Sequence, residues 1–266
     1  MLTKYRTAVI LCGGKGSRLG ETGKKMPKTL IQIHKKPILW YIINELIYNG
    51  DFNHFILPVG HKGEMIKNFI EKNFNTKKYK NIKFDIINTG LNTNISNRIF
   101  KISNRILSNS FLLLNGDAIF SFKLKNFFLN HLKKNMDLTM LTCSVVSPFG
   151  VIITKNFKPI NFRRNMNYDS IHNSQRKIFG EIYTGMSIIQ LSLLREIKFK
   201  NYDNFEMNFY PKILKLKNKF KCDFKRIKGF WYAMDDLKQV ELANRSLNKS
   251  LTSNKINKIK SNLNDK

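Results

Sequence analysis

The chain has 266 residues, of which 42% are hydrophobic and 12% aromatic, which is enough to bury a core and excludes wholesale disorder. No apolar run reaches the roughly 18 residues that a membrane-spanning helix requires, and the nearest one, Pro37–Tyr48, is interrupted by Asn44 and Glu45. The N-terminus shows no apolar stretch followed by a signal-peptide cleavage site. We therefore expect no membrane partner.

Charge and cysteine content bear on partners and location. The chain carries 47 Lys and Arg against 18 Asp and Glu, a formal net charge of +29, which some nucleic-acid-binding proteins share. However, the basic residues are spread along the whole chain, and Lys, Asn and Ile are enriched together, as in AT-rich coding sequences. We favour a composition bias over a nucleic-acid surface. The scattered Cys12, Cys143 and Cys222 favour reduced thiols and a cytoplasmic location.

In the first half of the chain, apolar runs alternate with segments of helical period. The predicted strands are Ala8–Cys12, His54–Val59, Ile82–Ile87 and Phe111–Leu114. The predicted helices are Pro37–Gly50, with Pro37 at its first position and Asn49-Gly50 as its C-cap, then Glu64–Asn73 and Ile95–Leu107. Gly20–Lys36 is predicted to be a long loop. This alternation predicts an α/β fold with a doubly wound, mostly parallel sheet.

The second half has a looser pattern. The predicted strands are Leu138–Val146, Val151–Thr154, Pro159–Arg164, Ile182–Gln190 and Cys222–Ile227. The predicted helices are Met207–Leu216 and Asp236–Leu247, and Asn165–Phe179 is predicted to be a polar loop. We expect one domain over residues 1–248 with a small mixed C-terminal embellishment, followed by a basic, flexible tail at 249–266.

The stretch Ala8–Leu19, AVILCGGKGSRL, carries the first chemical signal. Glycines that follow a buried strand, as Gly13–Gly16 does, let backbone N–H groups turn towards an anion. Lys15 and Arg18 add positive charge, so the expected guest is a phosphate. The stretch fits neither the P-loop nor the dinucleotide fingerprint, whose third glycine would fall on Leu19. Taken alone, a glycine-rich turn without a ligand stays an alternative.

Acidic residues follow two other strand-like segments. Asp117 ends the turn Asn115–Asp117, and the carboxyl ends of parallel strands meet at one edge, so it is expected near the glycine turn. Its half-buried carboxylate needs a partner, and a divalent cation or a helix cap would serve. Asp236 is predicted to cap the last helix, which leaves Asp235 free to join Asp117 in holding Mg²⁺. Lys28 is a candidate second cation for phosphates.

As a set, these segments resemble the sugar-1-phosphate nucleotidyltransferases. The opening resembles that family's G-G-x-G-[ST]-R-L, Pro-Lys-Pro and x-K-P-[IL] signatures. NTGLNT at 88–93, LLLNGD at 112–117 and GFWYAMDDL at 229–237 resemble its glucose-1-phosphate cytidylyltransferase branch. The resemblance extends to about residue 248. It implies a Rossmann-like nucleotidyltransferase fold, with a nucleotide-binding part at about 1–120 and a sugar-phosphate part at about 121–248.

The resemblance also implies a reaction. The phosphate of a sugar 1-phosphate, glucose 1-phosphate first, attacks the α-phosphorus of a nucleoside triphosphate, CTP first, and pyrophosphate leaves. Such chemistry depends on positioning and charge neutralisation, with Mg²⁺ as cofactor. The matching catalytic positions are Arg18, Lys28 and Asp117, and the metal positions are Asp117 and Asp235. The nucleotide positions are Leu11, Gly13, Gly14, Gly16, Ser17, Arg18, Thr89, Gly90 and Thr93. The sugar-phosphate positions are Lys28, Arg164, Thr184 and Gly185.

The sequence departs from the family pattern on the sugar side. Family members carry Glu-Lys-Pro there, and Asn161–Met166 has neither the Glu nor the Lys. Arg163 or Arg164 can neutralise a phosphate, but an arginine cannot accept a hydrogen bond from a sugar hydroxyl. Thr29 replaces the second proline of Pro-Lys-Pro, and Thr184-Gly185 replaces Gly-Gly. Either the sugar differs from glucose or its binding is weakened.

Other functions stay open on the sequence alone. The runner-up is a guanylyl- or uridylyltransferase for mannose or heptose 1-phosphate. A binding-only relative is suggested by the missing Glu-Lys, and a nucleic-acid-binding protein by the net charge. The presence of Arg18, Lys28, Asp117 and Asp235 favours an enzyme. The expected partners are a nucleoside triphosphate and a sugar 1-phosphate, a homo-oligomer is left open, and the implied pathway is polysaccharide precursor synthesis.

Overall fold

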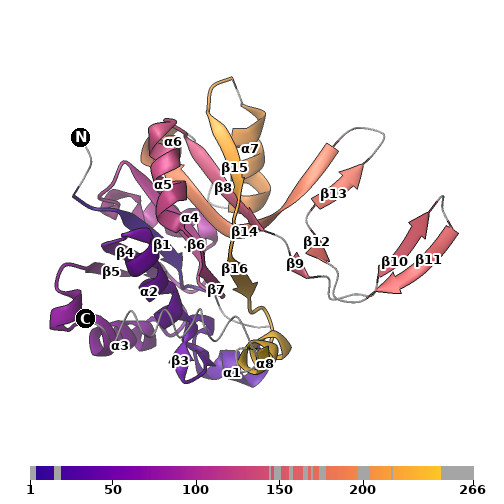
Figure 1. Ribbon diagram of the computed structural model, residues 1–266. Helices are drawn as coiled ribbons and strands as arrows, with labels where there is room; N and C mark the ends of the chain where they lie inside the picture. The colour runs from indigo at the N-terminus through magenta and orange to yellow at the C-terminus, as the bar shows by residue number, and fades with distance from the viewer. Residues whose placement is uncertain are drawn as a thin grey trace.

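The computed structural model describes residues 4–14, 19–143, 145–146, 151–155, 158–163, 167–168, 170–173, 178–196, 204–216 and 218–246. Its main sheet follows the strand order β15–β8–β14–β6–β1–β4–β5 (Figure 1). The strands are β1 (Thr7–Leu11), β4 (His54–Val59), β5 (Lys83–Asn88), β6 (Ser110–Asn115), β8 (Leu138–Cys143), β14 (Ile178–Gln190) and β15 (Cys222–Arg226).

Most neighbouring strands of this sheet run in parallel. β1 pairs in parallel with β4 and β6, β4 pairs in parallel with β5, and β8 with β15. β14 is antiparallel to both β6 and β8. The predicted α/β fold with a doubly wound, mostly parallel sheet is confirmed. Because the four parallel strands β5, β4, β1 and β6 point the same way, their carboxyl ends form one edge of the sheet.

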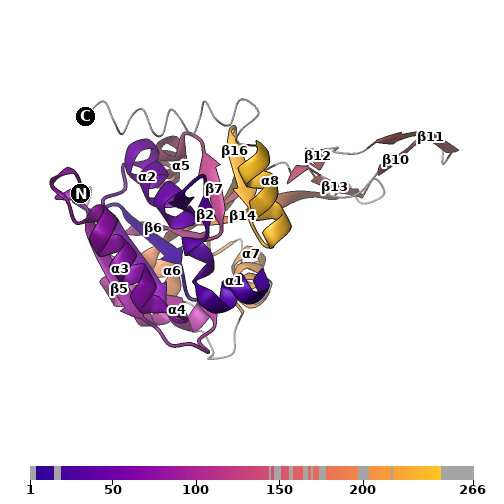
Figure 2. The same ribbon diagram turned by 90° about the horizontal axis from the view of Figure 1, so that it is seen from below.

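Helices cover both faces of the sheet (Figures 1 and 2). Alternate residues of a strand face opposite sides, so Ala8 and Ile10 belong to one hydrophobic core and Val9 to the other. The first core includes residues of α2 (Ile38–Gly50), α3 (Gly63–Phe74), α5 (Leu124–Lys133) and α8 (Leu237–Ser246). The second includes residues of α4 (Ile95–Ile102), α6 (Leu191–Glu196) and α7 (Tyr210–Lys215).

The segment 20–36 is more ordered than the predicted loop, so that prediction was wrong. It holds the helix α1 (Gly20–Lys25), the 3₁₀ turn η2 (Lys28–Leu30) and the small hairpin β2 (Gln32–Ile33) and β3 (Lys36–Pro37). α1 has Glu21 in its first turn, which suits the helix dipole. Lys62 Nζ donates to the carbonyls of Lys24 and Lys25 and satisfies the end of the helix.

Two predicted helices have different ends. α2 begins at Ile38, with Pro37 as an extended N-cap residue, and it includes Gly50; its C-cap is Asp51, in the left-handed region at φ +55°. α4 ends at Ile102 and continues as the 3₁₀ turn η4 (Ser103–Arg105), not as a helix to residue 107. These errors concern element boundaries, which local signals define least sharply.

Several short elements were not predicted. β7 (Ala118–Ser121) and β16 (Phe230–Ala233) pair with each other in antiparallel fashion, and α5 follows β7. The predicted loop 165–179 instead contains β12 (Asn167–Tyr168), which pairs with β9 (Val145–Val146), and β13 (Ser170–Asn173), which pairs with β14. By contrast, the strands predicted at Val151–Thr154 and Pro159–Arg164 are present as β10 (Val151–Lys155) and β11 (Lys158–Arg163), which form a hairpin (Figure 1). The π-helix η5 (Phe205–Phe209) precedes α7, so the predicted helix 207–216 begins inside a π-helix.

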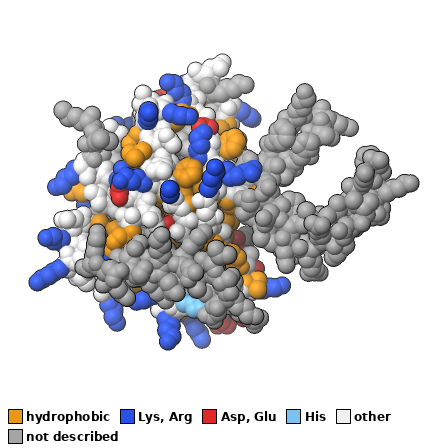
Figure 3. Space-filling view, in the orientation of Figure 1, with side chains coloured by type: hydrophobic (Ala, Val, Ile, Leu, Met, Phe, Trp, Pro, Cys, Tyr) orange, Lys and Arg blue, Asp and Glu red, His pale blue; other side chains and the backbone are white. Residues whose placement is uncertain are grey.

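The basic side chains of the described residues are distributed over the surface. In Figure 3 the Lys and Arg side chains are scattered over the visible face and do not form one patch. This distribution agrees with a general composition bias. None of the described helices has the length and apolar character needed to cross a membrane.

Candidate active site

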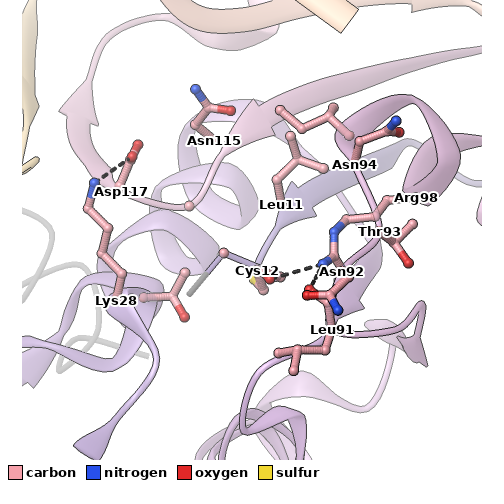
Figure 4. A pocket seen from close by; sticks show the side chains of 15 residues that line it. Leu11, Cys12, Lys28, Leu91, Asn92, Thr93, Asn94, Arg98, Asn115 and Asp117 are labelled. Atoms are coloured by element: carbon pink, nitrogen blue, oxygen red, sulfur yellow. Dashed lines mark hydrogen bonds and ion pairs between the residues drawn. The ribbon is translucent and has the colours of Figure 1, made fainter. Parts of the chain in front are cut away.

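A pocket of about 600 Å³ lies at the carboxyl edge of the parallel strands. Its walls come from residues 11–14 at the end of β1, 28–29 at the start of η2, 91–95 with Arg98, and 115–117 after β6. Figure 4 shows Lys28 and Asp117 on one side of the pocket and Arg98 on the other, with Leu11 between them. Six of the predicted positions line it, namely Leu11, Gly13, Gly14, Lys28, Thr93 and Asp117.

Arg98 is a buried cation in contact with Gly13. Only 5% of the residue is exposed, and its Nη2 donates to the carbonyl of Gly13 at 3.0 Å. Its Nη1 donates to the carbonyl of Val59 at 3.1 Å and to the hydroxyl of Thr89. A Cβ on Gly13 would lie 2.2 Å from the guanidinium, so the close approach of these two segments requires glycine there.

The charge of Arg98 has no ionic partner among the described residues. Burial lowers the pKa of its guanidinium, although an arginine stays protonated in proteins. Burial also raises the pKa of the neighbouring Cys12 thiol to about 12, which leaves that thiol neutral. Neutral carbonyls and a hydroxyl therefore hold the cation, and its positive potential extends into the pocket that it lines.

The sequence reasoning missed Arg98, although a signal was present. α4 buries Ser96, Ile99 and Ile102, and Arg98 is the one charged residue buried with them. A charged residue at a position where helical spacing predicts burial is costly unless it has a task. Asn94 is the N-cap of this helix, and its side chain accepts a hydrogen bond from Asn97 N at 2.8 Å.

The segment 89–93 supports the pocket wall next to Arg98. Thr89 is 1% exposed and donates to the carbonyl of Val59 at 2.9 Å, so it lies behind the wall and does not line the pocket. Its own carbonyl accepts from Thr93 Oγ1 at 2.6 Å and from Lys101 Nζ at 2.8 Å. Gly90 adopts φ +100°, which favours glycine, and also lies outside the lining. Of the three predicted positions, Thr93 alone reaches the pocket.

Lys28 joins the two predicted acids on the opposite wall. Its Nζ lies 2.8 Å from Asp117 Oδ2 and 2.9 Å from Asp235 Oδ1. Burial opposes the charge on this ammonium, but the two carboxylates outweigh that effect and raise the pKa of Lys28. Three residues separated by up to 207 positions in the chain thus form one cluster.

The β7–β16 pair explains why the two acids meet. Ala118 of β7 lies opposite Ala233 of β16, so the residues just before Ala118 and just after Ala233 are neighbours. Met234 N donates to the carbonyl of Asp117 at 2.9 Å and extends this ladder to the acids themselves. Asp117 and Asp235 therefore converge, as predicted, although the strands responsible were not foreseen.

The end of this ladder is fixed by a helix cap. Gln239 N donates to Asp236 Oδ1 at 2.8 Å, and Gln239 Oε1 accepts from the backbone N–H groups of Asp235 and Asp236. This is a reciprocal cap at the start of α8. The prediction that Asp236 caps the helix is confirmed, and the Asp235 carboxylate contacts Lys28 beside the residues that line the pocket.

The donor set fits a hard divalent cation. Two carboxylate oxygens already surround one positive charge, and Mg²⁺ takes one or two carboxylates and completes its shell with water and substrate phosphates. Within the described residues there is no group of three or more His, Cys, Asp or Glu that could enclose a metal. Asp117 and Asp235 would therefore hold a metal that is shared with a ligand.

Thr184 and Gly185, two of the predicted sugar-side residues, lie behind the pocket wall near Asn115. Thr184 is 3% exposed and donates to the carbonyl of Leu141 at 2.9 Å. Gly185 adopts φ +76°, and a Cβ there would lie 2.6 Å from Asn115 Nδ2. Asn115 lines the pocket, so Gly185 makes room for that carboxamide at the point where β14 crosses the end of β6. Sequence reasoning had placed Asn115 only in a turn.

Four predicted positions lie outside the described residues, namely Gly16, Ser17, Arg18 and Arg164. Their predicted roles stay predictions. Arg163, the alternative to Arg164, is the last residue of β11.

The fold and the pocket define an α/β protein whose ligand site lies where parallel strands end in a glycine turn and two convergent acids. Residues 7–161 match the family model described as nucleotidyl transferase. The relatives include proteins named as cytidylyl-, guanylyl- and uridylyltransferases of sugar 1-phosphates. The chain belongs to the nucleotidyl transferase family and, within it, to the sugar-1-phosphate nucleotidyltransferases.

Three comparisons give the range of similarity. The probable glucose-1-phosphate cytidylyltransferase of Bacillus subtilis (strain 168) is 32% identical over 182 residues, which cover 62% of this chain and 71% of that protein. The D-glycero-alpha-D-manno-heptose 1-phosphate guanylyltransferase of Aneurinibacillus thermoaerophilus is 29% identical over 208 residues, covering 77% and 84%. The crystal structure of HddC from Yersinia pseudotuberculosis shares the fold, with a TM-score of 0.66, 20% identity and coverage of 91% and 99%.

Proposed function

We propose that this chain transfers CMP from CTP to glucose 1-phosphate and releases pyrophosphate. The observation that carries the proposal is the pocket in which a glycine turn over Arg98 faces the cluster of Lys28, Asp117 and Asp235. Positive groups on both walls and a pair of carboxylates suit a polyphosphate that arrives with a divalent cation.

In this proposal the chain's own residues position two anionic substrates. The turn at Gly13 and Gly14 approaches the triphosphate, and the buried charge of Arg98 attracts it from below. Lys28 neutralises charge on the α-phosphate or the sugar phosphate, a role in which Arg18 would assist. Asp117 and Asp235 would hold Mg²⁺, which supplies charge neutralisation at the phosphate oxygens when bound. In-line attack then needs no covalent intermediate.

The wall near Arg98 supports CTP as the nucleotide. The Watson–Crick edge of guanine presents the N1–H and N2–H₂ donors, which call for an acceptor such as a carboxylate, whereas cytosine presents two acceptors and one donor. Asp117 is the one carboxylate among the residues that line the described pocket, and Lys28 pairs with it. Residues 91–95 include no carboxylate, the Thr93 hydroxyl already donates to the Thr89 carbonyl, and the Asn94 carboxamide oxygen already accepts from Asn97 N. The similarity to the Bacillus protein points the same way.

Guanylyl transfer to a heptose 1-phosphate is the second candidate. The Aneurinibacillus relative matches a longer part of this chain than the Bacillus protein does. The absence of the Glu-Lys pair from residues 161–166 also favours a sugar other than glucose. Both candidates use the same phosphate and metal machinery, so they differ only in what the pocket walls recognise.

A substrate panel tests the proposal. The protein is incubated with Mg²⁺, each of CTP, GTP, UTP and dTTP, and glucose, mannose or heptose 1-phosphate, and pyrophosphate release is followed. We expect the highest kcat/KM with CTP and glucose 1-phosphate, and no release by the double variant Asp117→Asn/Asp235→Asn. Activity confined to GTP and heptose 1-phosphate would select the second candidate. If no combination releases pyrophosphate and the protein binds RNA tightly, both candidate functions are contradicted.

A further inference from the structure

Lys28 occupies the position that the proposed function gives to a metal ion. Its Nζ contacts both carboxylates, at 2.8 and 2.9 Å. Mg²⁺ binds oxygen at about 2.0–2.1 Å, so the two carboxylates would close around it by less than about 1 Å each. The ammonium and the divalent cation therefore compete for the same space.

We propose that Lys28 is an exchangeable placeholder, which bridges and partly neutralises Asp117 and Asp235 until a nucleotide arrives with its cation and then moves onto the phosphates. This inference rests on the proposed function and adds a coupling to it. Metal binding and the engagement of Lys28 with phosphate become one event, because neither can take place fully without the other.

Charge is the first argument. Two carboxylates with partly exposed side chains, 27% for Asp117 and 47% for Asp235, share a single ammonium whose own side chain is 18% exposed, which leaves one negative charge in excess. A doubly charged ion between the same oxygens would repel that ammonium at a few ångströms. A phosphate in the adjoining pocket offers the displaced ammonium a new anionic partner. Without that phosphate, metal entry would leave Lys28 half-buried and without a counter-ion.

The backbone at Lys28 permits the exchange. Lys28 opens η2, where Leu30 N donates to the Pro27 carbonyl at 2.9 Å and Ile31 N to the Lys28 carbonyl at 3.2 Å. The main chain is thus fixed while the four-carbon stem of the lysine can change rotamer. Lys28 also lines the pocket that holds the glycine turn, so a short swing keeps the ammonium within the same site.

The coupling makes a prediction about the protein without nucleotide. Wild-type protein should bind a divalent cation weakly, since the cation must displace a resident charge that has nowhere to go. Removal of that charge should strengthen binding of the metal alone, even though the same change weakens catalysis. An ordinary phosphate-binding lysine would have no such effect on the metal.

The test titrates Mn²⁺ alone into nucleotide-free protein and follows the free ion by electron paramagnetic resonance. We expect Lys28→Met to bind Mn²⁺ about tenfold more tightly than wild type, and Lys28→Met/Asp117→Asn to lose the gain. Lys125→Met is the matched control, because Lys125 also pairs with an aspartate, Asp51, at 2.6 Å, and should leave Mn²⁺ affinity unchanged. A folded Lys28→Met that binds Mn²⁺ no better than wild type would overturn the inference.

Two further measurements keep the test decisive. Thermal unfolding should show Lys28→Met below wild type in the absence of metal, with a larger upward shift of Tm on adding Mn²⁺. Lys28→Gln, which keeps a polar group, serves if Lys28→Met does not fold. These readouts need no turnover. Tighter Mn²⁺ binding in a protein inactive with every sugar phosphate would defeat the proposed function alone, and an active enzyme without the gain would defeat the placeholder alone.

Discussion

Buried polar and charged residues lie at both edges of the parallel sheet, but they belong to the scaffold at the amino edge and to the pocket at the carboxyl edge. At the amino edge, His54 receives a contact from Thr7 Oγ1 on Nδ1 at 3.0 Å and meets Asp85 on Nε2 at 3.0 Å. Also at that edge, His131 Nδ1 lies 2.9 Å from Thr139 Oγ1. These polar groups are held by neighbours that belong to the scaffold. At the carboxyl edge, Arg98 has only neutral partners among the described residues.

The comparison shows how one sheet separates stability from function. Polar groups at the amino edge contact scaffold residues outside the pocket, so their loss should lower stability and leave chemistry intact. Lys28, Asp117 and Asp235 at the carboxyl edge also pair with one another, but Lys28 and Asp117 line the pocket and all three side chains are partly exposed. Replacing any of these three residues should lower turnover far more than stability, because their ion pairs with one another are exchanged for contacts with the ligand during the proposed reaction.

The largest expected effect is that of Asp117→Asn on turnover. The variant keeps the shape of the side chain but loses one of the two proposed metal carboxylates, and kcat should fall on the order of 10²–10³-fold. Lys28 keeps its contact with Asp235, so the Tm should change little. Steady-state pyrophosphate release and a thermal melt measure both quantities.

A matched change at the other edge provides the control for that variant. Asp51 pairs with Lys125 far from the pocket and sits at φ +55°, a conformation that asparagine tolerates. Asp51→Asn should leave kcat unchanged. Equal losses of kcat in the two variants would remove the distinction between the edges.

A smaller effect is expected for Arg98→Met. Loss of the buried charge should raise the KM for the nucleoside triphosphate about tenfold, and loss of the donors to Gly13 and Val59 should lower the Tm as well. Arg98→Lys restores the charge but not the forked donors, so it should recover part of the KM while its Tm stays low. A variant with low Tm and an unchanged KM would make Arg98 a purely structural residue.

The sequence predicted best what depends on local signals. The strand His54–Val59 was predicted to the residue because it is a continuous apolar run with clear ends, and the Asp236 cap because capping needs only a three-residue spacing. β7 and β16 were missed for the opposite reason. Each has four residues, and each exists only through pairing with a partner more than 100 positions away.

The same physical limit applies to the site. Because the carboxyl ends of parallel strands meet at one edge, Asp117 was expected near the glycine turn. The family resemblance paired Asp117 with Asp235, which do lie together, and it assigned Lys28 to a phosphate. That Lys28 bridges the acids depends on the length and direction of a side chain, which no spacing rule encodes. The sequence did not predict Arg98 as a site residue, because its position depends on hydrogen bonds to carbonyls of three other segments that fold around it.

A further effect, on stability and not on turnover, is expected in acid at the amino edge. His131 is 2% exposed, its Nε2 has no partner among the described residues, and burial lowers its pKa to about 4. The unfolded chain, with a histidine pKa of about 6.5, takes up the proton first as the pH falls. The stability that neutral His131 contributes is therefore present above pH 6.5 and is lost as the pH falls towards 4, by at most about 3 kcal/mol.

Replacement of this ring isolates its contribution. His131→Asn can keep the bond to Thr139 while removing the titrating group and the orphaned nitrogen, so its Tm should vary less between pH 6.5 and 4 than the Tm of wild type. Burial also lowers the pKa of His54, although the neighbouring Asp85 carboxylate acts in the opposite direction. Some acid sensitivity should therefore persist in the variant. The kcat at pH 7.5 should not change, since His131 lies outside the pocket. An unchanged Tm profile would place the acid sensitivity elsewhere, and a lower kcat would mean that the two edges are coupled.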